Sequence, residues 1–321
     1  MGKYIIRRIF DLLPTIFVVA VIVFIVTRMI PGDPASVMLG PQASVEDIEA
    51  LRQKLGLNEP IYMQFLQYIG NLLQGDLGIS YTYNEPIFSL IMDRFPNTII
   101  LAASALIIAV VIGIPAGIIS ASKQNSLLDY SVMLISLIGV SLPIFWLGVM
   151  LVLYFSVNLG WFPATGMGTL EEGFIPYIKH LVLPSITLAT IPMATFARIT
   201  RSSMLEVISH DYIKTARSKG LSEFLVICKH AFKNALTPIL TVLGMQISML
   251  LGGAVLTETI FSWPGMGRLI VDAIDKRDFV VVQGTVLFIA VIFVVVNLLV
   301  DILYKVVNPR VNYTSSKGGM K

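Results

Sequence analysis

Six long, charge-poor hydrophobic stretches dominate the chain, and shorter polar segments separate them. Each is a continuous apolar run without strand-like alternation, which favours membrane helices over the strands of a barrel. The first, with its flanks, is about 20 residues long, enough for the roughly 30 Å hydrocarbon core of a bilayer. The pattern predicts an all-α, polytopic membrane protein with six transmembrane helices. The stretches cover residues 12–26, 97–121, 130–157, 181–197, 234–257 and 279–300.

Two details refine these spans. Prolines at positions 14, 115, 143 and 192 lie inside them and predict kinks and tight packing rather than loss of the helix. The first stretch could instead be a signal peptide. It is long for that role, however, and no small-x-small cleavage site closes it, so we expect a retained helix.

Composition supports a membrane protein. Of the 321 residues, 55% are hydrophobic and 13% are charged, against roughly 25% charged in an ordinary soluble domain. The single cysteine, Cys228, lies in a polar loop, so no disulfide framework is expected within the chain. No nucleic-acid-binding motif is present.

The distribution of charge predicts the topology. Six spans place both termini on one side, and the segments on that side hold 15 of the 23 Lys and Arg residues but 6 of the 20 acids, a net +9. The other side holds 8 basic and 14 acidic residues, a net −6. The positive-inside rule therefore predicts a multi-pass protein of the cell (inner) membrane with both termini in the cytoplasm. The polar loop 198–233 is then cytoplasmic.

The first external segment is long enough for a small helical domain. Ser44 starts a capping-box-like sequence, and Gly56 suits the end of the helix that follows. A second helix is expected from Pro60 to Gln74, although a loose loop is the alternative. A short re-entrant or interfacial helix is expected at 268–273. The predicted organisation is a cytoplasmic N-terminus and first helix (1–30), an external domain (31–96), a five-helix core with a cytoplasmic loop at 198–236 (97–308), and a flexible tail (309–321), polar from Asn312.

The sequence carries no recognisable catalytic apparatus. It lacks a Gly-x-x-x-x-Gly-Lys-Ser/Thr phosphate loop, a His-Glu-x-x-His zinc motif and a Gly-x-Ser-x-Gly elbow. Its three histidines are far apart in sequence, which disfavours a metal site. The middles of the spans carry no ionisable residue, which disfavours a proton-coupled transporter. Sodium coupling through backbone carbonyls stays open.

The polar loop holds the most informative stretch. Residues 211–220 predict a short helix, because an acid at its start suits the helix dipole and Gly220 suits its end. Ala216 and Gly220, four residues apart, predict a smooth strip that another protein could approach. Tyr212 offers an amphipathic ring to a partner groove. The alternative is a solvated basic loop that lies against anionic lipid.

This stretch resembles the cytoplasmic "EAA" loop of ABC importer permeases, in the peptide-importer form Asp-Tyr-Ile-x-Thr-Ala-Arg-x-Lys-Gly-Leu. One departure from the family is Ser218, at a position where this loop often has Ala. The chain as a whole resembles permease subunits of the dipeptide/oligopeptide/nickel ABC importer family through further marks in the same order. These are Tyr4-Ile5-Ile6-Arg7-Arg8, Pro31-Gly32-Asp33-Pro34, Leu55-Gly56-Leu57, Gly75-Asp76-Leu77-Gly78-Ile79-Ser80, Arg94-Phe95-Pro96-Asn97-Thr98, Ser141-Leu142-Pro143-Ile144-Phe145-Trp146, Leu183-Pro184 and Glu258-Thr259-Ile260-Phe261-Ser262-Trp263-Pro264-Gly265-Met266-Gly267.

The resemblance implies a type I ABC importer permease fold and no enzymatic activity or cofactor in this chain, with ATP and magnesium held by partner subunits. The implied partners are a second homologous permease, two cytoplasmic ATPases and an extracytoplasmic solute-binding protein, with peptides as the transported class. An ion-coupled secondary transporter, an intramembrane enzyme and a structural membrane protein are the alternatives. The residues implied to couple the chain to the ATPases are Asp211, Tyr212, Thr215, Ala216, Arg217, Lys219 and Gly220.

Overall fold

A computed structural model of the chain describes residues 2–29, 33–40, 42–54 and 56–307. Throughout these residues the regular structure is helical, and the one pairing of extended backbone is an isolated bridge between Ile79 and Pro86. The fold is therefore all-α, as predicted. The predicted flexible tail from residue 309 lies outside the described residues.

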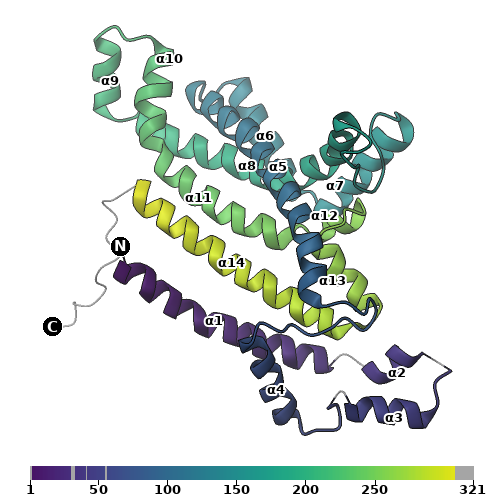
Figure 1. Cartoon of the computed structure of the whole chain (residues 1–321). Helices are drawn as coiled ribbons and strands as arrows, with labels where there is room; N and C mark the ends of the chain where they lie inside the picture. Colours follow the sequence, from purple (N-terminus) through teal and green to yellow (C-terminus); the bar gives the residue numbers. More distant parts are fainter. Residues whose placement is uncertain (1, 30–32, 41, 55, 308–321) are drawn as a thin grey trace. The chain divides into compact units, whose positions relative to one another are not determined.

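The chain forms two compact units, each assembled from three separate stretches of sequence. The first unit takes residues 1–104, 144–187 and 251–294, and the second takes residues 105–143, 188–250 and 295–321. Four long helices, labelled α5, α8, α11 and α14 in Figure 1, contribute residues to both units. The first unit contains α1 (Gly2–Met29), α2 (Pro34–Leu39), α3 (Val45–Lys54), α4 (Ile61–Leu73), the start of α5 (Ile87–Ser122), α7 (Ile144–Leu151), the π-helix η1 (Val152–Asn158), the start of α8 (Phe174–Ile208), α12 (Val255–Ile260), α13 (Met266–Asp275) and most of α14 (Phe279–Val307).

The second unit holds the remainder of α5, α8 and α14 together with the polar loop. Its other elements are α6 (Leu127–Ser141), α9 (Asp211–Ser218), α10 (Glu223–Leu225), the π-helix η2 (Val226–Ala231) and nearly all of α11 (Phe232–Gly253). Gly113 and Gly117 lie on the face of α5 that packs against α8. A Cβ atom at either position would come within 2.5 Å of a backbone carbonyl oxygen of α8. Small residues four apart thus allow close contact between two apolar helices.

Four helical segments among the described residues are long and apolar enough to cross a membrane. They are Ile87–Ser122, Phe174–Ile208, Glu223–Gly252 and Phe279–Val300. The third predicted span is interrupted at Leu142 and Pro143 and counts as a fifth crossing only if its two pieces belong to one span. The first predicted span appears as the shorter apolar segment Leu13–Met29. The count of six therefore stays a prediction.

Both helices expected in the segment predicted to be external are present. In the capping box, the backbone N–H of Asp47 donates to Ser44 Oγ at 3.1 Å, and that hydroxyl donates to Asp47 Oδ2 at 2.6 Å. The second helix, α4, packs against α1, with ring centroids 5.2 Å apart for Phe24 and Phe65 and 5.6 Å apart for Phe24 and Tyr68. This segment is therefore anchored to the first helix and is not a loose loop.

Candidate functional site

The polar loop folds into a helical hairpin made by α9 and the α10–η2 segment, which leads into α11 (Figure 1). Asp211 occupies the first turn of α9, where a carboxylate is favourable near the positive end of the helix dipole. Gly220 adopts a φ of +76°, a left-handed conformation that favours glycine and turns the chain away after the helix. Both sequence signals therefore act as predicted.

The inner face of α9 is fixed to the rest of the unit by two apolar side chains. Ile213 is fully buried and Ala216 is 8% exposed, and both belong to one hydrophobic cluster. The cluster also contains Met204 at the end of α8 and Val226 in η2. Because the two residues are three positions apart, they lie on one side of the helix and attach it to the surrounding elements.

The outer face of α9 is free among the described residues and is polar. It is formed by Asp211, Lys214, Thr215 and Ser218, which are all exposed and recur at helical spacing. The expectation of a smooth strip made by Ala216 and Gly220 is therefore wrong for Ala216. Its methyl group faces the chain's own core because burial of Ile213 rotates that side of the short helix inward.

Polar contacts hold the two ends of the hairpin together. Asn234 Nδ2 donates to the Tyr212 hydroxyl oxygen at 2.9 Å. Arg217 donates to both carboxylate oxygens of Glu223, at 2.7 and 3.3 Å. Tyr212 and Arg217 were predicted to face a partner, but each also ties α9 to the following segment. Lys219 is the C-cap of α9 and its side chain is exposed.

Sequence reasoning missed the residues that position the hairpin, namely Ile213, Glu223 and the amide of Asn234 as the partner of Tyr212. Ile213 did carry a signal, because it is an isolated β-branched apolar residue in a polar helix. The pairing of Arg217 with Glu223 spans a turn whose geometry the sequence does not specify.

A second constellation joins two of the sequence marks, 94–98 and 258–267, which lie about 160 residues apart in the chain. Asn97 Nδ2 donates to the carbonyl oxygen of Pro264 at 2.9 Å, and Trp263 Nε1 donates to the carbonyl oxygen of Asn97 at 2.9 Å. The Thr98 hydroxyl donates to Glu258 Oε1 at 2.7 Å and accepts from the backbone N–H of Met266 at 2.9 Å. The start of the α5 apolar stretch is thus locked to the turn before α13.

Glu258 is the centre of that constellation and is fully buried. Its Oε2 accepts from the backbone N–H groups of Gly267, at 2.7 Å, and Arg268, at 3.1 Å, so the carboxylate caps the start of α13. Burial raises the pKa of Glu258, and the hydrogen bonds from Thr98, Arg268 and Gly267 act in the opposite direction. A Cβ atom at Gly265 would lie 2.2 Å from Glu258 Oε1, so glycine is needed there for the carboxylate to fit.

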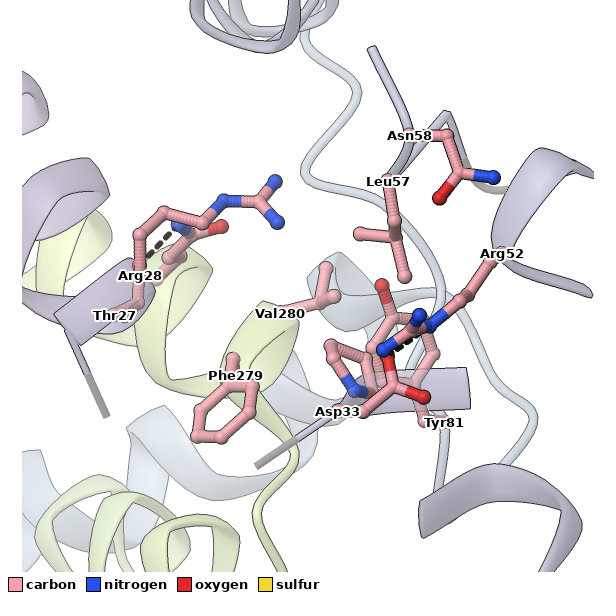
Figure 2. A pocket seen from close by; sticks show the side chains of 11 residues that line it. Thr27, Arg28, Asp33, Arg52, Leu57, Asn58, Tyr81, Phe279 and Val280 are labelled. Carbon is pink, nitrogen blue, oxygen red and sulfur yellow. Dashed lines mark hydrogen bonds and ion pairs between the residues drawn. The ribbon is translucent and has the colours of Figure 1, made fainter. Parts of the chain in front are cut away.

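A polar cavity of about 280 Å³ lies in the first unit, where the end of α1, the segment predicted to be external and the start of α14 meet. Figure 2 shows Arg28 on one side of this cavity and Arg52, paired with Asp33, beside Tyr81 on the other. The Arg52 Nε to Asp33 Oδ1 distance is 3.0 Å. Within the described residues, no three His, Cys, Asp or Glu side chains are grouped as metal ligands would be.

Known proteins resemble this chain over nearly its whole length. The family described as "Binding-protein-dependent transport system inner membrane component" matches residues 113–313, and its N-terminal companion family matches residues 1–102. The di/tripeptide transport system permease protein DppB of Pseudomonas aeruginosa is 46% identical over 98% of this chain and 99% of its own. The dipeptide transport system permease protein DppB of Alkalihalophilus pseudofirmus is 48% identical over 98% of this chain and all of its own.

The glutathione transport system permease protein GsiC of Escherichia coli K12 is 43% identical over 98% of this chain and all of its own. Among solved structures, an inward-facing form of the MetNI methionine ABC transporter contains a chain that matches with a TM-score of 0.57 and 21% identity. The match covers 70% of this chain and 99% of that one. This likeness shows that the shared fold is that of a type I ABC importer permease.

Proposed function

Because the chain belongs to the family of binding-protein-dependent transport system inner membrane components, we propose that it is a permease subunit of an ATP-driven ABC importer for peptides. The named activities of its relatives support the peptide class. Three permeases that cover nearly the whole chain at 43–48% identity are named for di/tripeptide, dipeptide and glutathione transport. All three solutes are small molecules with peptide-type bonds and free carboxylates.

In this proposal the chain forms half of a translocation path, and a second homologous permease forms the other half. Two cytoplasmic ATPases bind ATP and magnesium, so this chain needs no nucleotide, metal or catalytic group of its own. A solute-binding protein delivers the peptide to the outer side. The six spans place both termini in the cytoplasm, as the positive-inside rule predicts, and the segment carrying α2 to α4 faces outward and contacts the binding protein.

The observation that carries the proposal is that α9 has one buried face and one exposed face. Its inner face is fixed by fully buried Ile213, while the outer face, Asp211, Lys214, Thr215 and Ser218, is exposed to a partner. A helix of eight residues that is bound firmly on one side can transmit the motion of a subunit bound on its other side. ATP-driven closure of the ATPases draws the two such helices of the importer together and switches the path between its inward and outward openings.

The test is purification of the tagged full-length chain in mild detergent, with identification of the proteins that accompany it. We expect a second permease and a nucleotide-binding subunit with the unchanged chain, and loss of the nucleotide-binding subunit alone with Thr215→Arg. Thr169→Arg makes the same exchange at another exposed position and serves as the matched control. Recovery of the chain alone under crosslinking conditions would overturn the proposal and favour a self-contained transporter.

A further inference from the structure

Another pocket lies in the second unit, beside the hairpin, and does not include the exposed residues of the outer face of α9. It has a volume of about 610 Å³ and is formed by the last turns of α5 together with the α10–η2 segment. Pro115, Ile119 and Lys123 come from α5 and the residue after it, and Phe224 and Ile227 come from the hairpin. The wall that α5 provides is thus apolar, and Lys123 lies at its end, directly after the last residue of the helix.

The apolar wall continues along α5 as a regular stripe. Ile107, Val111, Pro115 and Ile119 are all exposed and each is four residues from the next, so neighbouring members touch and form a ridge that turns slowly around the helix. Lys123 follows Ile119 by the same interval, directly after the helix ends at Ser122. The rise from Ile107 to Ile119 is about 18 Å, at roughly 1.5 Å per residue, which is close to half the roughly 30 Å core of a bilayer.

The charges at the polar end do not cancel. Arg217 and Glu223, which also line the pocket, neutralise each other through the ion pair described above. Lys123 makes no side-chain hydrogen bond or ion pair with any residue that the structure describes, so the pocket keeps one uncompensated positive charge. Phe224, in α10, is 78% exposed and adds an aromatic ring to the apolar surface of the pocket.

We propose that this pocket binds one anionic phospholipid, whose acyl chain lies along the α5 stripe between Ile107 and Ile119 and against Phe224, and whose phosphate meets Lys123. A phospholipid combines an apolar chain of one-leaflet length with a terminal anion, which is the order of surfaces that the pocket presents. The side chain of Lys123 reaches the headgroup level from the end of a membrane helix as such lysines do. The inference depends on α5 lying in the membrane and not on the solute that the chain transports.

The bound lipid would also touch the hairpin of α9 and α10–η2. Its polar end lies next to the Arg217–Glu223 pair, which joins α9 to α10.

Cys228 allows a direct test, because it lines this pocket and is the only cysteine of the chain. In the assembled transporter, the cysteines of the partner subunits are replaced, so that Cys228 is the one labelling site. It is labelled with a small fluorophore, and the complex is placed in nanodiscs of phosphatidylcholine. Brominated phosphatidylglycerol or brominated phosphatidylcholine is then added as a contact quencher. One uncompensated lysine predicts that the anionic lipid binds about fivefold more tightly.

Lys123→Gln should abolish the preference for the anionic lipid while leaving contact quenching by both lipids. Lys233→Gln removes the same charge from an exposed position outside the pocket and should leave the preference unchanged. Native mass spectrometry of the unlabelled protein gives an independent count of retained phosphatidylglycerol. Absence of quenching by either lipid, or equal quenching by both in the unchanged chain, would overturn the proposal.

Discussion

Replacing Ile213 by alanine should release α9 from its packing against the rest of the second unit without unfolding the membrane helices. Ile213 is fully buried in the cluster that anchors the hairpin. Truncation of a buried isoleucine to alanine costs about 2–5 kcal/mol. An eight-residue helix is not stable by itself in water, so its docked state depends on these inner contacts.

The polar tethers are too weak to replace that contact. The Asn234–Tyr212 hydrogen bond contributes about 1 kcal/mol. The Arg217–Glu223 pair is substantially exposed, with 39% and 65% of the side-chain areas accessible, and exposed pairs contribute about 0–1 kcal/mol. The expected loss from Ile213→Ala therefore equals or exceeds what these two polar tethers contribute together.

Hydrogen exchange of the backbone amides of residues 211–218, followed by mass spectrometry in nanodiscs, measures this directly. We expect Ile213→Ala to lose protection there while the helices of the first unit keep theirs. Ile213→Val, which costs about 0.5–1.5 kcal/mol, should keep most of the protection. Thr215→Arg should keep full protection yet fail to retain the nucleotide-binding subunit. Unchanged protection in Ile213→Ala would refute the argument that this side chain anchors the helix.

Three further predictions concern packing and buried charge. Glu258→Ala leaves buried donors without an acceptor and should lower thermal stability by several degrees more than Glu258→Gln, which keeps an acceptor oxygen; equal melting temperatures would count against the capping role. Burial raises the pKa of Glu258 above its unfolded value. The stability that its protonated form contributes is therefore present below the unfolded pKa and is lost as the pH rises through the folded pKa. Glu258→Gln should flatten this part of a plot of melting temperature against pH, and parallel curves for the two proteins would contradict the argument. Gly117→Ala would place a Cβ 2.5 Å from the Ala197 carbonyl oxygen and should cost about 1–3 kcal/mol in a detergent melting assay, whereas Gly252→Ala, which meets no atom within 4 Å, should be tolerated.

The sequence by itself determined the class of protein and the course of most helices. Long apolar runs can satisfy their backbone hydrogen bonds in lipid only as helices, so the spans at 97–121, 181–197, 234–257 and 279–300 could be read directly and lie within α5, α8, α11–α12 and α14. The short helix at 211–220 and its glycine stop also followed from local signals, because capping and the left-handed turn depend on neighbouring residues alone.

Only the tertiary structure decided which way these elements face and what they touch. An eight-residue polar helix has no apolar face broad enough to specify its orientation, so burial of Ile213, which turns Ala216 inward, came from the surrounding cluster. The contact between Thr98 and Glu258 joins residues 160 positions apart, and no local pattern encodes such a pairing. The pocket at Lys123 exists because α5 and the hairpin meet in space, although its stripe of residues every four positions was already present in the sequence.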